Sequence, residues 1–316
     1  MLLGPSLGCA TDPVDLEPVA DGNGPGPATA PPATAPEPRT AGPTERIAPP
    51  PVATGGDVLV RVGTDDIGAR ELADRFRERH REKFDNILKD LLVERVVRRE
   101  NETHKIDVPA AILDAEVARD REIYEKEARL QYQMGLDELL KAQGRSSEDF
   151  TRLSREHALY VHTLRRLVRH AQLQRGAVKV RHIVVKTREE ALGLHAKLVQ
   201  GADFATLARQ HSLCPSRRDG GNLAMVVPGV YAAAGHAEVE ATLAVLDAGQ
   251  LSSVVAAKTG FHVFEALYRE PPHPAASYAE LADRVASSLE RFPVSDEEID
   301  WWLEQIRPRY PLVQHF

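Results

Sequence analysis

The sequence predicts an α+β protein with an all-α domain and a compact domain built on a small antiparallel sheet. Apolar residues recur every three or four positions through most of residues 71–177, which is typical of amphipathic helices. Between residues 178 and 270, β-type runs enclose short helical segments. Residues 271–316 are expected to complete the all-α domain. The length of 316 residues agrees with two domains.

Residues 1–57 form a Pro/Ala-rich tail that we expect to be disordered. Twelve of the 22 prolines lie between residues 11 and 57, and the first aromatic residue of the chain is Phe76. Such a segment cannot bury enough apolar surface to offset its ordering entropy. The folded part is therefore expected to begin near Val58, which leaves roughly 260 residues, enough for two cores.

The start of the chain carries a possible modification site at Cys9. Leu7-Gly8-Cys9 resembles the end of a bacterial lipobox, where a cysteine becomes the lipidated N-terminus, although Ser6 stands where Leu is usual. Eight preceding residues are too few for a signal peptide, so we expect its beginning to lie upstream. The alternative is a cysteine without function. A lipid anchor followed by a Pro-rich spacer would predict an envelope protein, in the periplasm or on the outer surface, held near a membrane.

Charge and cysteine content exclude two classes of protein. Residues 58–177 hold 24 basic and 23 acidic residues, and residues 178–270 hold 10 and 9, so neither carries the basic field of a nucleic-acid-binding protein. Cys9 and Cys214 are the only cysteines, too few for a disulfide framework. No run of about 18 apolar residues predicts a membrane span.

Residues 58–177 are predicted to be helical after a first strand at Val58–Val62. A helix from Asp107-Val-Pro109 to about Gly135 and another beginning at Ser146 or Ser147 follow from proline and capping signals. Leftover apolar grooves in such a charged assembly would suit extended polypeptide. Two further sets describe these helices: an apolar stripe (Phe84, Ile87, Leu88, Leu91, Leu92, Val96) and three histidines for which surface roles are favoured over metal binding (His157, His162, His170).

The sequence of residues 178–270 predicts, in order, a strand, two helices, a loop, a helix and a strand. The strands are expected at 178–186 and 260–267, the helices at 188–200, after Asp203 and at 238–246, and the loop at 212–229. This order favours an α+β unit of about 90 residues with an antiparallel sheet.

Five motifs in this block resemble a parvulin-type peptidyl-prolyl isomerase domain. They are Val180-Arg-His-Ile-Val-Val-Lys, Gly201-Ala-Asp-Phe-Ala-Thr-Leu-Ala, His211-Ser-Leu-Cys-Pro-Ser, Gly220-Gly-Asn-Leu and Thr259-Gly-Phe-His-Val. The preceding residues 58–177 resemble the N-terminal region of SurA-type and PrsA-type chaperones. The resemblance implies that residues 271–316 return to pack on that region through a helix over 278–307, as the C-terminal helix does in those proteins.

Prolyl isomerisation makes modest chemical demands. The amide is planar by resonance and its rotation costs about 20 kcal/mol, but no bond breaks and no cofactor is needed. A catalyst must bind the twisted amide better than the planar one. Because twisting makes the amide less polar, an apolar pocket favours it, while hydrogen-bonding side chains hold the proline in place.

His182 and His262 lie in the first and last predicted strands, and they share one face if those strands are neighbours. The resemblance implies that both form the floor of the site with Cys214 as the catalytic polar centre. It also implies substrate-binding positions around them, hydroxyl (Ser212, Thr259) and apolar (Leu223, Met225, Val239). Buried core histidines are one alternative. A zinc site of His182, His262 and Cys214 is another, disfavoured because no local ligand pair is present.

Departures from the family pattern weaken the expected proline pocket. Asn222 replaces the usual Asp, and Val239 stands where the family has Phe. The segment 229–238 is about four residues longer than usual, and Tyr231 is a candidate replacement for the family's pocket Met. A smaller side chain at Val239 removes about 1–3 kcal/mol of contact by large-to-small reasoning.

The sequence therefore predicts an isomerase and folding chaperone that binds X-Pro segments, with weak or altered activity. A non-enzymatic holdase chaperone with a degenerate parvulin domain is the alternative, and a maturation factor for one secreted client is a third.

Overall fold

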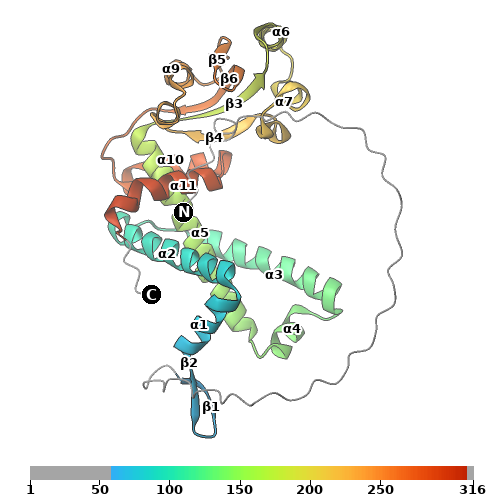
Figure 1. Cartoon of the computed structure of the whole chain (residues 1–316), viewed down its shortest axis with the longest axis vertical. Helices are drawn as coiled ribbons and strands as arrows, with labels where there is room; N and C mark the ends of the chain where they lie inside the picture. The colour runs from blue at the N-terminus through green and yellow to red at the C-terminus, as the bar shows by residue number, and fades with distance from the viewer. Residues whose placement is uncertain (1–57, 312–316) are drawn as a thin grey trace, which may run out of the picture. The chain divides into compact units, whose positions relative to one another are not determined.

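A computed structural model describes residues 58–311 (Figure 1). The Pro/Ala-rich tail and Cys9 lie outside the described residues. The described chain forms two compact units, residues 58–92 and residues 93–311, and the boundary falls inside helix α2 (Arg81–His104). None of the helices in the described range has the length and apolar character required to cross a bilayer.

The first unit consists of a hairpin and helical residues. Strands β1 (Val58–Val62) and β2 (Asp65–Gly68) pair antiparallel, and α1 (Ala69–Arg79) follows. Every residue of β1 is exposed. Of the predicted stripe on α2, Ile87 and Leu91 are about half exposed, and its other members are half-buried. Its first fully buried apolar residue is Val97, which belongs to the second unit.

The helical part of the second unit has one large core. Trp302 and Val285 from the C-terminal helices pack with Leu167 and Val168 of α5. The segment predicted as one helix over 278–307 forms two helices, separated by Phe292-Pro-Val-Ser295, because proline cannot donate a helical hydrogen bond. The helices are α3 (Ala110–Tyr132), α4 (Leu136–Ala142), α5 (Ser147–Arg175), α10 (Tyr278–Arg291) and α11 (Asp296–Ile306), with the short η2 (Arg307–Arg309) after them.

Residues 177–270 form a four-stranded antiparallel sheet with helices around it (Figure 1). The strand order is β4-β3-β6-β5, so the first and last long strands are the two central neighbours. The predicted loop at 212–229 contains η1 and β4, and β5 was also absent from the prediction. The elements are β3 (Ala177–Val185), α6 (Arg188–Val199), α7 (Phe204–His211), η1 (Pro215–Asp219), β4 (Asn222–Val226), α8 (Val230–Ala233), α9 (Ala237–Val245), β5 (Val255–Ala257) and β6 (Gly260–Glu270).

The two faces of this sheet carry different cores. Ile183 and Val263 point to one face and pack with apolar residues of α6 and α7. Val180 and Phe264 point to the other face and pack with residues of α8 and α9. Alternation along the strands puts His182 on this second face.

Gly221 is required by the close approach of the chain to β3. Its φ is +85°, and a Cβ at this position would lie 2.4 Å from the carbonyl oxygen of His182. A side chain there would force the segment before β4 away from the strand that carries His182. The paired glycines therefore set the position of this segment against β3.

Candidate functional site

The two histidines meet on the α9 face of the sheet. In the register of β3 and β6, His182 lies opposite Phe264, and His262 lies opposite Val184. Diagonal neighbours in an antiparallel pair share a face. The ring centroids of His182 and His262 are 5.6 Å apart, and the His262 ring stacks on Phe264 at 5.5 Å and 12°. The prediction that the strands carrying the two histidines are neighbours is therefore confirmed.

Both imidazoles are buried and neutral. His182 is 2% exposed and His262 is 5% exposed. Burial, with the nearby His262, lowers the pKa of His182 to about 3. Burial, with the nearby His236, lowers the pKa of His262 to about 4. Neither ring therefore carries charge near neutral pH.

Hydrogen bonding distinguishes the two rings. Thr259 Oγ1 lies 2.8 Å from His262 Nε2, which orients that ring. Within the described part of the chain, the other His262 nitrogen and both nitrogens of His182 have no hydrogen-bond partner. Such buried atoms are unusual and call for an explanation, such as a ligand that supplies the partner.

Ser212 and Cys214 lie on the segment that runs beside β3. The hydroxyl oxygen of Ser212 accepts hydrogen bonds from the backbone N–H groups of Val184 (3.1 Å) and Cys214 (3.3 Å). The backbone N–H of His182 donates to the carbonyl oxygen of Gly221 (2.8 Å). Cys214 is 1% exposed and immediately precedes η1. These bonds hold the segment alongside the strand that carries His182.

The apolar side of the site is a continuous cluster. Leu223, Tyr231 and Val239 belong to the same buried group as Phe264, which lies 5.6 Å from His182 between ring centroids. Burial raises the pKa of Tyr231 to about 12. The structure thus brings Leu223, Val239 and the candidate replacement Tyr231 together next to the histidines.

Glu240 supports the long segment 229–238. Its carboxylate accepts hydrogen bonds from the backbone N–H groups of Gly229 (2.7 Å) and Tyr231 (3.1 Å). This segment also contributes His236, which is 4% exposed and whose ring lies 6.5 Å from that of Tyr231. Sequence reasoning missed His236, because it lies where the chain departs from the family pattern and no motif marks it.

Met225 is not a member of this buried cluster, although it lines a cavity together with Leu223 and Tyr231, and its place around the proline ring stays a prediction. Its Sδ lies 3.1 Å from Nη1 of Arg169, and its backbone N–H donates to Glu298 Oε1 (2.6 Å). The register of β3 and β4 shifts between Lys179 and Arg181. This irregularity disturbs the alternation of side chains, so Leu223 belongs to the buried cluster and Met225 does not, although both line that cavity.

A cavity of about 260 Å³ opens beside the apolar cluster. Leu223 and Tyr231 line it from the sheet-containing part, and Glu298 and Trp301 line it from α11. Predicted proline-site residues therefore form part of a cavity that a C-terminal helix helps to build.

The histidines of α5 do not gather. His162 Nε2 lies 3.2 Å from Glu116 Oε1, whereas His170 Nε2 lies 3.1 Å from the carbonyl oxygen of Ala276. Across residues 58–311, no group of three His, Cys, Asp or Glu side chains is arranged to hold a metal ion.

In comparison with known proteins, residues 179–267 match the rotamase family, described as PPIC-type PPIase domain. Chaperone SurA of Pseudomonas fluorescens is 34% identical over 143 residues, which cover 42% of this chain and 32% of SurA. Foldase protein PrsA of Geobacillus kaustophilus is 25% identical over 238 residues, which cover 75% of this chain and 79% of that protein. The chain thus spans about a third of the length of the matched SurA.

A solved structure of a peptidylprolyl isomerase, PrsA from Bacillus cereus, aligns with 83% of this chain and 95% of its own at 21% identity and a TM-score of 0.30. The assignment of the rotamase domain rests on the family match. The parvulin resemblance of residues 178–270 is confirmed.

Proposed function

We propose that this protein is a peptidyl-prolyl cis-trans isomerase and folding chaperone that acts on extended polypeptides containing X-Pro bonds. The observation that carries the proposal is the neutral pair His182 and His262, stacked with Phe264 beside an apolar cluster in a PPIC-type domain. The likeness to proteins named chaperone and foldase supports the wider role.

The geometry fits catalysis by differential binding. Uncharged imidazoles in a buried site keep the surroundings of the amide low in polarity, which favours the twisted state that has lost resonance. Thr259 orients His262, while unpartnered nitrogen atoms of His182 and His262 are available to the substrate. Leu223 and Val239 would contact the prolyl ring. We place no group in a proton-transfer role, since isomerisation moves no proton.

Entry of a prolyl ring requires a local movement. Leu223, Tyr231 and Val239 are each at most 8% exposed. Because Tyr231 lies in the segment held by Glu240, we propose that displacement of residues 229–238 opens the site. The burial of these three side chains also favours the second candidate function, a holdase whose rotamase domain is inactive.

A protease-coupled assay on a prolyl tetrapeptide tests the enzymatic role. We expect a rate above background at micromolar protein, and a loss of at least tenfold in His262→Ala. His195→Ala, on α6 behind the opposite face, is the matched control and should keep full activity. No rate above background would overturn the enzymatic claim. Suppression of aggregation by that inactive protein would then establish the holdase.

We also propose attachment to a membrane of the bacterial envelope through an acylated Cys9, with residues 10–57 as the spacer. The support is the sequence Leu7-Gly8-Cys9 and the proline content that follows. Incorporation of labelled palmitate in a bacterial host, lost in Cys9→Ala, is the expected result. Equal labelling of both proteins would contradict the assignment.

A further inference from the structure

A second hollow lies in the helical part, far from the rotamase motifs in the sequence. It has a volume of about 400 Å³ and is bounded by α3, α4 and α5. This volume falls within the range of roughly 300–1,000 Å³ that is usual for ligand sites. We call it the α3–α5 groove; its apolar and aromatic lining includes Tyr124, Tyr132, Leu140, Phe150 and Leu153.

The groove presents apolar and aromatic side chains to solvent. Tyr124 is 50% exposed, Tyr132 is 54% exposed and Leu153 is 41% exposed. Below them, Leu140 and Phe150 are buried in a small separate core, and the Phe150 ring meets that of Tyr124 edge-on at 5.6 Å. Aromatic residues are only 5% of this chain, so three at one groove are a concentration. Exposed apolar patches of this kind mark interaction sites.

Polar groups in the groove indicate what the occupant is. Asp120 and Glu127 lie on its α3 wall, and Arg145 is the only Lys or Arg in its lining. Asp120 accepts a hydrogen bond from Ser154, whereas no hydrogen bond or ion pair of the Glu127 carboxylate occurs among the described residues. The acidic α3 wall complements a basic side chain and disfavours an anionic lipid headgroup.

Two glutamines add groups suited to a polypeptide backbone. Gln131 and Gln143 line the groove, and each side-chain amide both donates and accepts hydrogen bonds. An extended peptide offers matching N–H and C=O groups along its length. An acyl chain offers none and would leave these amides without partners where it covered them.

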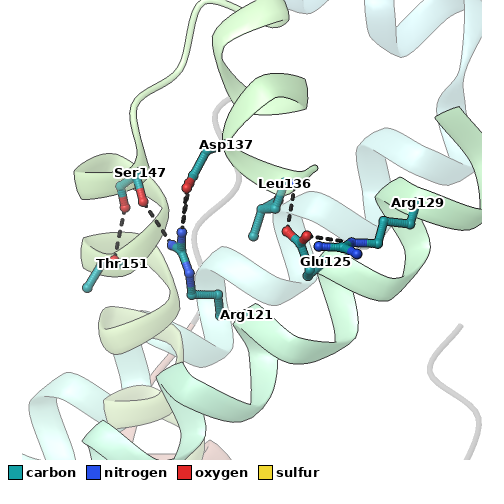
Figure 2. Close-up of polar contacts among 7 residues, drawn as sticks. All are labelled: Arg121, Glu125, Arg129, Leu136, Asp137, Ser147 and Thr151. Atoms are coloured by element: carbon teal, nitrogen blue, oxygen red, sulfur yellow. Dashed lines mark hydrogen bonds and ion pairs between the residues drawn. The ribbon is translucent and has the colours of Figure 1, made fainter. Parts of the chain in front are cut away.

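The wall formed by α4 is fixed by polar contacts, which Figure 2 shows. Arg121 donates to both carboxylate oxygens of Asp137 (2.7 and 2.8 Å) and to Ser147 Oγ (2.8 Å). Glu125 accepts from the backbone N–H of Leu136 at the start of α4 (2.7 Å) and from Arg129 (2.8 Å). These contacts hold the pKa values of Asp137 and Glu125 below their usual range.

A wall held in place before binding lowers the ordering cost of association. We propose that the α3–α5 groove binds an extended polypeptide segment in which an aromatic or large aliphatic side chain lies next to a basic residue. The apolar side chain would enter between Tyr132 and Leu153, and the basic residue would pair with Glu127. This inference rests on the proposed chaperone function and names its peptide site.

The test uses the full chain and a fluorescent peptide of about twelve residues with a central Phe-Lys pair and no proline, which removes the prolyl contacts of the rotamase site. In fluorescence polarisation we expect Leu153→Ala and Tyr132→Ser to weaken binding about tenfold. Leu159→Ala is the matched control, because Leu159 is also exposed on α5 (45%) but does not line the groove. Unchanged circular dichroism shows that each variant folds.

Reversing the charge at Glu127 gives the second arm of the peptide-binding test. Glu127→Lys should weaken the Phe-Lys peptide and strengthen a Phe-Glu peptide, whereas Glu122→Lys on the same helix should alter neither by more than about twofold. Equal effects of Leu153→Ala and Leu159→Ala, or no effect of either, would overturn the groove assignment. If the chain still suppressed aggregation in that case, the proposed function would stand; loss of every peptide and chaperone signal would remove both.

Other occupants have distinct signatures. A dimer in sedimentation that disappears in Leu153→Ala would assign the groove to a second copy of the chain and overturn the proposal. Displacement of the peptide by dodecylphosphocholine below its micellar concentration, with the same dependence on Leu153, would assign it to a lipid and overturn the proposal as well.

Discussion

Two buried polar clusters in this molecule are built on opposite principles. His182 and His262 are uncharged, and three of their four ring nitrogens have no partner within the described chain. Arg169 of α5 and Glu298 of α11 form an ion pair at 3.2 Å with both side chains at most 1% exposed. Arg169 also donates to Ser288 Oγ (2.7 Å) and the carbonyl oxygen of Phe292 (2.9 Å). Glu298 accepts the backbone N–H of Met225.

The charged cluster is a structural joint, whereas the neutral cluster is the proposed substrate site. The charged cluster draws its partners from α5, α10, α11 and β4, so it fixes the rotamase domain against the helical part through groups that are mostly satisfied internally. The neutral cluster keeps hydrogen-bonding capacity unused. We infer that a polar group left without a partner at the histidines is tolerated because the substrate completes it.

Breaking the Arg169–Glu298 ion pair should have the largest effect on the stability of the protein. Glu298→Leu leaves Arg169 buried without its counter-charge, and Met225 loses the acceptor of its N–H. Removing one partner of a buried pair costs about 3–5 kcal/mol, measured as the free energy of unfolding in urea. Glu297→Leu, at the exposed neighbouring position, is the control.

The double variant Arg169→Met/Glu298→Leu sharpens this result. Replacing both charges by apolar groups removes the uncompensated charge, so its stability should lie closer to wild type than that of Glu298→Leu. A loss below about 1 kcal/mol in Glu298→Leu would show that the pair is not the joint that we describe.

Acid should act on the neutral cluster. The pKa values of His182 and His262 in the folded state are about 3 and 4, below the ordinary value near 6.5. Below pH 6.5 the unfolded chain therefore binds more protons at these two histidines than the folded chain does. The stability contributed by each neutral histidine is complete above that pH and is lost towards pH 4 and then pH 3.

Acidification from pH 6.5 to pH 5 should lower the free energy of unfolding by about 2 kcal/mol for each histidine, at ~1.4 kcal/mol per pH unit. Urea unfolding across this range measures it, with His182→Phe/His262→Phe as the comparison that cancels all other titrating groups. Parallel stability curves for wild type and the double variant would contradict the assignment of neutral, buried rings.

Replacing His182 alone should separate function from stability, the reverse of Glu298→Leu. In His182→Phe, a ring without hydrogen bonds becomes an apolar ring of similar size, which is close to neutral for folding. We expect unfolding free energy within about 1 kcal/mol of wild type, yet a fall of at least tenfold in kcat/KM for a prolyl peptide, about 1.4 kcal/mol. Full activity in a stable variant would remove His182 from the site.

The same comparison explains what could be predicted from the sequence. His182 and His262 were found because each lies in a β-type run inside a motif, and adjacency of two long strands places both on one face. The Arg169–Glu298 pair could not be found this way, since its members lie 129 positions apart and nothing in a charged residue type signals burial. The contact of Met225 with Arg169 could not be predicted for a related reason, because a register shift carries no sequence mark.

The shortest strands could not be predicted from the sequence, because they contain too few residues to show a pattern. Strands β4 and β5 have five and three residues, too few for alternation to separate them from a loop. The break between α10 and α11 is different, because Pro293 marks it in the sequence, whereas the single helix over 278–307 was expected from the family resemblance. Short strands and single irregularities thus depend on tertiary pairing.

Thr259→Val should give the smallest change and tests how the neutral cluster is oriented. The substitution keeps the shape of the side chain and removes the hydroxyl 2.8 Å from His262 Nε2. One neutral hydrogen bond is worth about 0.5–1.5 kcal/mol, so kcat/KM should fall roughly three- to tenfold in the protease-coupled assay. Thr259→Ser, which keeps the hydroxyl, should restore most of the rate. If Ser and Val behaved alike, Thr259 would act through packing, and the orientation of His262 would have to come from its stacking on Phe264.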